Sequence, residues 1–323
     1  MSNKTYLRER FFPHLWCPGC GHGTVLNSLL RAVEQLGMSK NEIVMASGIG
    51  CSSRISGYVD FHTLHTLHGR ALAFATGVKL SKPELNVIVP MGDGDALAIG
   101  GNHFIHACRR NIDITAIVMN NRIYGMTGGQ VSPTTPVDGR TTTTPWGNLE
   151  EPFDLCRLAI GAGAVRISRW PMGYPYETVQ AIEDAISTKG FTLVEILAPC
   201  PTGWKMDPPD ARDHLISTME EIFPLGVYKD IAEEVAPGHW DRVSLPFEVK
   251  ERHDYLQGMQ TPLDLEPVPA GPAHELAARQ EPSRGRSDGR SDLQKLLEDA
   301  QPVWEPGATA EETQGALEND FDI

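Results

Sequence analysis

Between about residues 29 and 197, short apolar runs alternate with stretches whose apolar residues recur every three or four positions. The short runs are rich in β-branched residues, which favour strands, whereas the longer spacing is typical of amphipathic helices. The expected strands are 42–46, 86–90, 115–119, 164–167 and 192–196, and the expected helices are 23–36, 69–80, 96–109 and 176–188. This alternation predicts an α/β fold with a doubly wound, mostly parallel sheet, in which ligands bind at the carboxyl ends of the strands.

Two stretches depart from the alternation. Residues 125–148 are rich in Gly, Thr and Pro and are longer than an ordinary connection, so they predict a functional loop. Beyond about residue 260, Pro, Ala, Glu, Ser and Arg dominate, which is typical of extended or disordered chain. The expected parts are a domain at 1–230, an extension at 231–260, and a tail at 261–323 that orders only against a partner, with a short helix at 291–300 and candidate anchors at Trp304 and Phe321.

The formal charge of −14 is concentrated towards the C-terminus, because residues 1–230 carry 20 Lys or Arg against 22 Asp or Glu, whereas residues 231–323 carry 8 against 20. An acidic chain without a basic stripe repels phosphates, which excludes a nucleic-acid partner. No apolar run approaches the roughly 20 residues that a bilayer span needs, and the first residues show no signal-peptide pattern. We therefore expect a cytoplasmic protein that binds no membrane.

A Gly-Asp-Gly motif directly follows the strand 86–90, and the next strand along the chain ends in Asn120 and Asn121. In a right-handed βαβ unit, the ends of these two strands are neighbours, so Asp93 and Asn121 would face one ligand. Mg²⁺ prefers oxygen ligands and takes few of them from protein. Glycines at 92 and 94 allow the backbone to approach a diphosphate.

This arrangement resembles the thiamine diphosphate motif, with Asp93 and Asn121 as Mg²⁺ ligands and Ile123 supplying a carbonyl oxygen. The alternative is a tight turn followed by an Asn-capped strand end. The spacing, the strand context and the following Gly-Met-Thr-Gly-Gly loop at 125–129 together favour the cofactor site.

Four cysteines can converge at the same edge of the sheet. Cys17 and Cys20 form a Cys-x-x-Cys motif, and Cys51 and Cys200 each follow a predicted strand. A thioredoxin-like dithiol is disfavoured because no strand precedes the motif. A structural zinc ion also accepts four cysteines, but an iron-sulfur cluster is more useful beside a cofactor that liberates electrons. The other two cysteines, Cys108 and Cys156, stand among apolar neighbours and are expected to be core residues.

Besides the cysteines and the Gly-Asp-Gly motif, the sequence contains the segments Gly-Ile-Gly-Cys-Ser-Ser at 48–53 and Leu-His-Gly-Arg-Ala at 67–71. With these features, the chain resembles the beta subunit of 2-oxoacid:ferredoxin oxidoreductases, of the 2-oxoglutarate type, over about residues 8–230. The resemblance implies thiamine diphosphate, Mg²⁺ and a 4Fe-4S cluster on Cys17, Cys20, Cys51 and Cys200. It implies oxidative decarboxylation of 2-oxoglutarate with coenzyme A to succinyl-CoA and CO₂, with ferredoxin as electron acceptor. It also implies an alpha subunit that completes the cofactor cleft, in a dimer of alpha-beta pairs.

The resemblance also suggests catalytic residues. His68 would transfer protons or hydrogen-bond the substrate, and Arg54 would hold a substrate carboxylate, although an exposed loop arginine is the alternative. His62, His65 and His68 recur every third position, but without a fourth ligand they do not favour a metal site. The residues expected to contact cofactor are Gly50, Cys51, Ser52, His68, Gly92, Asp93, Gly94, Asp95, Asn121, Ile123, Gly125, Met126 and Thr127.

Three other functions are weighed against this one. The same chemistry could act on pyruvate or another 2-oxoacid, which the sequence does not decide. A zinc-stapled, non-catalytic scaffold of the same fold would contain no iron, but the intact Asp93 and Asn121 argue against it. A non-oxidative thiamine decarboxylase would have no use for four converging cysteines, and such enzymes carry both cofactor-binding domains on one longer chain.

Overall fold

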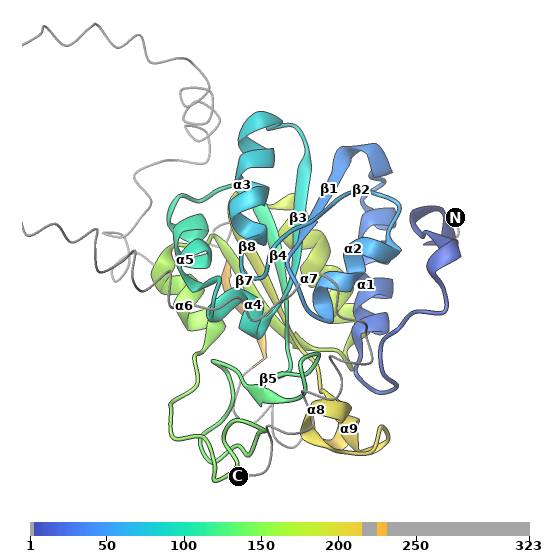
Figure 1. The fold of residues 1–323 in the computed structure, drawn as a ribbon. Helices are drawn as coiled ribbons and strands as arrows, with labels where there is room; N and C mark the ends of the chain where they lie inside the picture. The colour runs from blue at the N-terminus through green and yellow to red at the C-terminus, as the bar shows by residue number, and fades with distance from the viewer. Residues whose placement is uncertain (1–2, 215–224, 231–323) are drawn as a thin grey trace, which may run out of the picture. The chain divides into compact units, whose positions relative to one another are not determined.

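A computed structural model describes residues 3–214 and 225–230, and this part is built around a seven-stranded sheet (Figure 1). The sheet confirms the predicted α/β fold, since every neighbouring pair is parallel except β7 with β9. Two of its strands, β2 and β9, were not predicted. In spatial order the strands are β2 (His62–His65), β1 (Ile43–Ser47), β3 (Asn86–Gly92), β4 (Ile114–Asn120), β8 (Thr192–Leu197), β7 (Arg166–Pro171) and β9 (Gly226–Asp230).

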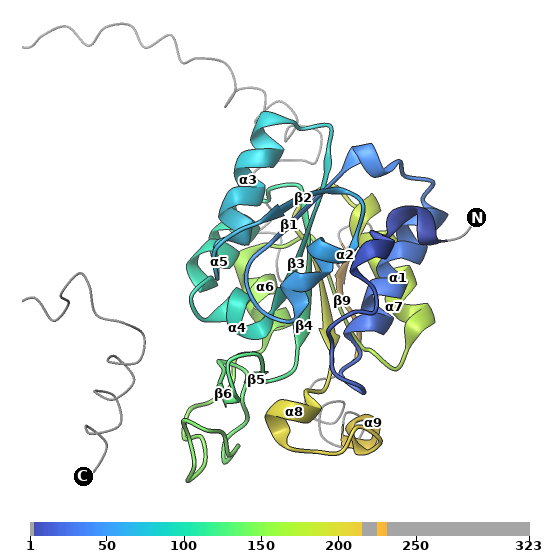
Figure 2. The same ribbon diagram turned by 45° about the vertical axis from the view of Figure 1, so that its right-hand side comes forward.

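Helices cover both faces of the sheet (Figures 1 and 2). One face carries α3 (Ala71–Ser81), α5 (Gly101–Arg109) and α6 (Leu155–Ala162), and the other carries α1 (His22–Gln35), α2 (Ile55–Tyr58) and α7 (Pro175–Ser187). The remaining elements are α4 (Asp93–Leu97), α8 (Pro201–Trp204), α9 (Asp210–His214), the 3₁₀ turns η1 (Asn3–Tyr6), η2 (Glu9–Phe11), η3 (Lys40–Glu42) and η4 (Ser52–Arg54), and a hairpin of β5 (Ile123–Tyr124) with β6 (Gln130–Val131). None of the described helices is long and apolar enough to cross a membrane.

The helix predicted at 96–109 is instead two helices. The chain leaves the helical conformation at Ala98, where ψ is −98°, and α5 begins only at Gly101. Two consecutive glycines, Gly100 and Gly101, weaken a continuous helix at this point because glycine loses more backbone freedom than other residues on folding. The break lets the short α4 stay against the end of β3 while α5 packs along the sheet.

The central strands are buried on both sides, as is usual in parallel sheets. On β4, Ile114, Ala116 and Val118 pack with α3, α5 and α6, whereas Ile117 and Met119 pack with α1 and α7. The alternation follows from the two-residue period of a strand. The two hydrophobic layers therefore hold the sheet in place and leave the ends of its strands to carry polar groups.

The carboxyl ends of the six parallel strands lie at one edge, where the β5–β6 hairpin and α8 also lie (Figure 2). The strand order reverses beside β1, since β2 lies on one side of it and β3 on the other. Such a reversal opens a crevice above the sheet, where ligands bind in folds of this kind. The predicted extension at 231–260, the tail at 261–323 with its helix at 291–300, and the anchors Trp304 and Phe321 lie outside the described residues.

The packing of α5 generates a stability prediction. Phe104 is fully buried, and its ring meets the ring of Phe191 edge-on with centroids 5.7 Å apart. Replacing it with alanine is expected to lower the free energy of unfolding by about 3–5 kcal/mol, measured by urea denaturation. Its neighbour Ile105 is 38% exposed, so Ile105→Ala is expected to cost less than about 1 kcal/mol. Equal losses in the two variants would contradict this packing.

Candidate active site

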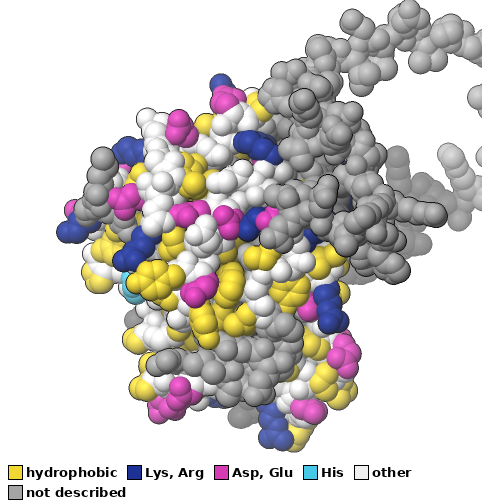
Figure 3. Space-filling model, turned by 180° about the vertical axis from the view of Figure 1, so that it is seen from behind, with side chains coloured by type: hydrophobic (Ala, Val, Ile, Leu, Met, Phe, Trp, Pro, Cys, Tyr) yellow, Lys and Arg dark blue, Asp and Glu magenta, His cyan; other side chains and the backbone are white. Residues whose placement is uncertain are grey.

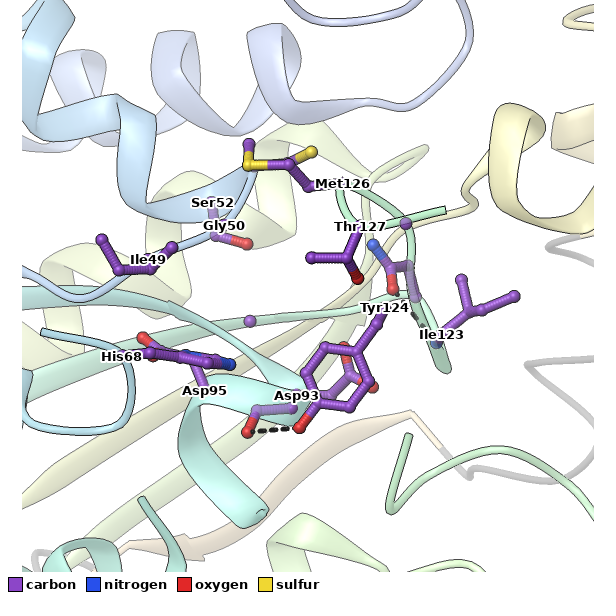
Figure 4. Close-up of a pocket in the computed structure, with 15 residues that line it drawn as sticks. Ile49, Gly50, Ser52, His68, Asp93, Asp95, Ile123, Tyr124, Met126 and Thr127 are labelled. Atoms are coloured by element: carbon purple, nitrogen blue, oxygen red, sulfur yellow. Dashed lines mark hydrogen bonds and ion pairs between the residues drawn. The ribbon is translucent and has the colours of Figure 1, made fainter. Parts of the chain in front are cut away.

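A pocket lies at the carboxyl ends of β1, β3 and β4, and four segments contribute to it (Figure 4). They are the turn after β1, the segment after β2, the start of α4, and the chain from Asn121 through β5 to the following loop. Each residue expected to contact the cofactor lies on this lining, which consists of Ile49, Gly50, Cys51, Ser52, His68, Gly92, Asp93, Gly94, Asp95, Asn121, Ile123, Tyr124, Gly125, Met126 and Thr127. Their contact with a cofactor stays a prediction.

Asp93 begins α4 and is almost fully buried. Thr134 donates a hydrogen bond to its Oδ2 at 2.7 Å. Burial raises the pKa of Asp93, although hydrogen bonds from Ser132 and Thr134 oppose the shift. The positive charge of the buried Arg122 also acts on Asp93, and a bound cation would stabilise its ionised form further. Nearby, the amide oxygen of Asn121 accepts from the N–H of Ile123 at 3.2 Å and keeps a second lone pair. The carboxylate oxygen of Asp93 and the amide oxygen of Asn121 are ligands of the kind that Mg²⁺ prefers.

His68 is held by a second buried carboxylate. Its Nδ1 lies 2.5 Å from Oδ1 of Asp95, and the N–H of Gly69 donates to the same oxygen at 2.6 Å. Because that oxygen is the acceptor, Nδ1 carries the hydrogen and Nε2 is left to the pocket. The Oδ2 atom of Asp95 is buried without a hydrogen-bond partner within the described chain. The sequence showed no sign of this pairing, since 27 positions separate the two residues.

Tyr124 also lines the pocket, although it was not predicted. Its hydroxyl donates to the carbonyl of Gly94 at 3.2 Å, and its ring meets His68 edge-on. A side chain at position 94 would bring its Cβ within 2.2 Å of the Tyr124 ring. The second glycine of the motif is therefore needed so that β5 can lie against α4.

The four cysteines named in the sequence gather beside this pocket. Burial raises the pKa of Cys20, Cys51 and Cys200, the last to about 11, and the negative charge of other thiolates in the set raises each of them further. Cys17 is exposed, whereas Cys51 lies on the pocket lining itself. The raised pKa values favour neutral thiols, and a bound metal centre would favour their thiolate form instead.

Hydrogen bonds reach two of these sulfurs from the segment after β8. The hydroxyl of Thr202 donates to Sγ of Cys17 at 3.3 Å, and the N–H of Gly203 donates to Sγ of Cys200 at 3.3 Å. Gly125 approaches from the pocket side, where a Cβ would stand 2.5 Å from Sγ of Cys200. The cysteine group and the cofactor loop are thus in direct contact.

Four cysteine ligands suit either a zinc ion or a 4Fe-4S cluster, and the choice of a cluster stays a prediction. Within residues 3–214 and 225–230, no three His, Cys, Asp or Glu side chains stand close enough to hold one metal ion. His62, His65 and His68 do not form such a group either, and the first two of them lie on β2.

Arg54 lines a second pocket, together with Arg8, Arg10, Tyr58 and His65, and is not on the lining of the pocket described above. It ends the η4 turn, and its side chain is exposed. Contact of Arg54 with a substrate carboxylate stays a prediction, and an exposed arginine on a loop stays its alternative.

Cys108 and Cys156 are buried in the hydrophobic layer next to α5 and α6, as expected for core residues. Burial raises the pKa of both thiols. Neither cysteine lies among the four beside the pocket.

Similarity to known proteins agrees with this site. The sequence model of the thiamine pyrophosphate enzyme C-terminal TPP-binding domain matches residues 44–196. The 2-oxoglutarate synthase subunit KorB of Archaeoglobus fulgidus is 53% identical over 240 residues, which covers 71% of this chain and 90% of the relative. The chain belongs to the KorB family. The KorB of Methanocaldococcus jannaschii is 44% identical over 266 residues, covering 79% of this chain and 97% of the relative.

A solved structure supports the membership. The 2-oxoglutarate:ferredoxin oxidoreductase from Magnetococcus marinus, with 2-oxoglutarate, coenzyme A and succinyl-CoA bound, matches with a TM-score of 0.67 and 32% identity, covering 82% of this chain and 93% of that chain. The resemblance inferred from the sequence motifs is thereby confirmed, and this KorB chain is a subunit of a 2-oxoglutarate oxidoreductase with a thiamine diphosphate-binding domain.

The contact between position 94 and Tyr124 can be tested. Gly94→Ala forces the Tyr124 ring to move, and overpacking of this kind costs about 1–3 kcal/mol. Thiamine diphosphate in the presence of Mg²⁺ is expected to bind about tenfold more weakly or worse, measured by calorimetry. Gly101→Ala on α5 is the matched control, because no atom lies within 4 Å of its added Cβ. Unchanged affinity in Gly94→Ala would refute the proposed role of this glycine.

Proposed function

We propose that this chain is the beta subunit that holds thiamine diphosphate, Mg²⁺ and a 4Fe-4S cluster in an enzyme converting 2-oxoglutarate and coenzyme A to succinyl-CoA and CO₂, with electrons passed to ferredoxin. The observation that carries the proposal is the position of Cys51, which belongs both to the pocket lining and to the four-cysteine group. A decarboxylation site and an electron acceptor would then share one residue. The reaction is reversible in principle, so it can also fix CO₂.

The residues of the pocket divide the work of binding and proton transfer. Asp93, Asn121 and the carbonyl of Ile123 would hold Mg²⁺ and, through it, the diphosphate. Thiamine diphosphate, when bound, supplies the electron sink on which decarboxylation depends. His68, fixed through its Nδ1 by Asp95, can give or take a proton at Nε2 on the pocket side.

The cysteine group would carry the electrons away. Cys17, Cys20, Cys51 and Cys200 supply four thiolates, the usual ligand set of a 4Fe-4S cluster. The donors on Thr202 and Gly203 described above would tune its potential, because hydrogen bonds to the sulfurs stabilise the more reduced state. Since Cys51 faces the pocket and Cys17 is exposed, the cluster would span the distance from the cofactor to the protein surface.

An alpha subunit would close the pocket. Ile49 and Met126, both on the lining, are 42% and 43% exposed, and Leu67 beside His68 is 68% exposed. Hydrophobic side chains also gather across the middle of the face shown in Figure 3, which is the side opposite to the view of Figure 1. Exposed apolar surface around a pocket is typical of a binding interface. The KorB relatives are themselves named as subunits, which agrees with a dimer of alpha-beta pairs.

The substrate proposal follows the relatives. The structural neighbour contains 2-oxoglutarate and coenzyme A, and the KorB relatives are named for 2-oxoglutarate. Among the described residues that line the pocket, His68 is the one basic side chain. The cation that pairs with the second carboxylate of 2-oxoglutarate would therefore come from the alpha subunit. Without that contribution, pyruvate would be the alternative substrate.

The decisive experiment uses protein purified anaerobically with its alpha subunit. We expect four iron and four sulfide per chain, and bleaching of the cluster absorption when 2-oxoglutarate and coenzyme A are added. Zinc in place of iron would overturn the electron-transfer role and favour the non-catalytic scaffold. Bleaching with pyruvate but not with 2-oxoglutarate would keep the chemistry and overturn the substrate.

The cysteine assignment makes a sharper prediction. Cys51→Ser is expected to lower the iron content and to abolish substrate-dependent bleaching, because serine is a poor substitute for a soft thiolate ligand of iron. Cys108→Ala removes a buried sulfur that is outside the group, so its iron content is expected to stay unchanged. Iron analysis and absorption spectra measure both. Equal iron in wild type and Cys51→Ser would remove Cys51 from the ligand set.

A further inference from the structure

We propose that Thr134, Asn120 and Glu195 form a buried chain of hydrogen bonds that positions the carboxylate of Asp93 for its cation. The inference rests on the proposed role of Asp93 as an Mg²⁺ ligand. The members come from separate elements: Asp93 follows β3, Asn120 ends β4, Glu195 lies on β8, and Thr134 lies in the long loop after β6. All four are buried, so their mutual contacts replace contacts with water.

The chain begins with the hydroxyl of Thr134. Its Oγ1 lies 2.7 Å from Oδ2 of Asp93 and 3.0 Å from Oδ1 of Asn120. A hydroxyl has one hydrogen, and a carboxylate is the stronger acceptor. The oxygen of Asn120 also accepts from the N–H of Arg122 at 3.1 Å and keeps a second lone pair for Thr134. The hydrogen of Thr134 is therefore shared between the two oxygens, with Asp93 as the stronger acceptor.

Asn120 is in turn held by Glu195. Its Nδ2 donates to Oε1 of Glu195 at 2.8 Å, which fixes the amide so that its oxygen faces Thr134. A rotated amide would place an N–H₂ group where the Thr134 hydroxyl and the Arg122 N–H now lie. The orientation of one amide thus keeps the Thr134 hydroxyl beside Asp93.

Glu195 is anchored from the neighbouring strand β7. Arg169, fully buried on β7, donates from Nε to Oε2 of Glu195 at 2.7 Å. It also donates to Asp154 at 2.6 Å and to the hydroxyl of Tyr228 on β9 at 2.5 Å. A buried ion pair contributes little net stability, because desolvation offsets its attraction. Its role here is to hold Glu195 in one position. The contacts follow the strand order β4, β8, β7 and β9.

The consequence is a link between the loop and the metal site. The loop after β6 delivers one hydroxyl to Asp93, and Thr135 beside it donates to the carbonyl of Arg122 at 2.7 Å, which secures the loop near its start. Loss of the Thr134 hydroxyl would leave Ser132 to hold the Asp93 side chain without its neighbour, so the carboxylate would be less firmly oriented although the sheet stays folded. Thr134 is therefore a positioning residue and not a ligand.

The test compares threonine variants in the complex with the alpha subunit. Thr134→Val keeps the shape and removes the hydroxyl, and at saturating thiamine diphosphate its Mg²⁺ affinity is expected to fall by about tenfold to a hundredfold, the usual cost of losing a group that orients a ligand. Thr134→Ser is expected to restore it. Thr115→Val, which removes another buried hydroxyl on β4 that donates to the carbonyl of Ala185, controls for structural damage and is expected to leave Mg²⁺ affinity unchanged.

Two outcomes separate the inference from the function on which it rests. If Asp93→Asn abolishes Mg²⁺ binding while Thr134→Val binds it as wild type does, the positioning chain is overturned and the proposed metal site stands. If Asp93→Asn binds Mg²⁺ normally, the metal site itself is wrong. Equal losses in Thr134→Val and Thr115→Val would reduce the effect to general destabilisation and would also overturn the inference.

Discussion

Parallel pairing of β1, β3, β4 and β8 determines where the functional groups of this chain lie. Parallel strands place all their carboxyl ends at one edge of the sheet, so residues that follow different strands meet there although they are far apart in sequence. The Gly-Asp-Gly motif, the two asparagines and Cys200 all follow these strands. The hydrophobic layers on both faces hold the strands in register, and this packing places the polar groups at the strand ends.

Three buried acids near this edge are stabilised in three different ways. Glu195 has an arginine, Asp95 has a histidine and a backbone N–H, and Asp93 has hydroxyl donors together with the charge of the buried Arg122. The difference matters because a buried charge is costly unless it is compensated. We propose that the carboxylate bonded by hydroxyl groups takes a cation, whereas the other two hold neighbouring side chains. Electrostatics thus separates binding groups from positioning groups.

The sequence predicted the central strands and the site that follows them, because long β-branched runs and motifs of fixed spacing are local signals. It missed β2 because His62 and His65 are exposed on an edge strand, which has no apolar run and is held by backbone pairing with β1. It also gave no sign that Arg54 would line a second pocket. A motif defines which residues are neighbours along the chain, but the direction of each side chain depends on the turn in which it lies.

The sequence also could not predict hydrogen bonds between residues that are far apart along the chain. Nothing in the residues around His68 indicates Asp95, and nothing around Asn120 indicates Glu195, because each pair forms only when separate strands have been placed side by side. Tyr124 was missed in the same way, since its ring fills space that exists only once β5 has folded against α4. Tertiary packing supplied this information.

The close approach of Gly125 to Cys200 makes the loop at Gly125 sensitive to oxidation of the Cys200 sulfur. With no room for even one extra carbon between the backbone and the sulfur, damage by oxygen at Cys200 would add bulk that presses directly on the loop beneath Met126 and Thr127. Oxidation of Cys200 would therefore disturb the proposed cofactor loop as well as the proposed cluster. If both proposals hold, one chemical change would impair decarboxylation and electron transfer together.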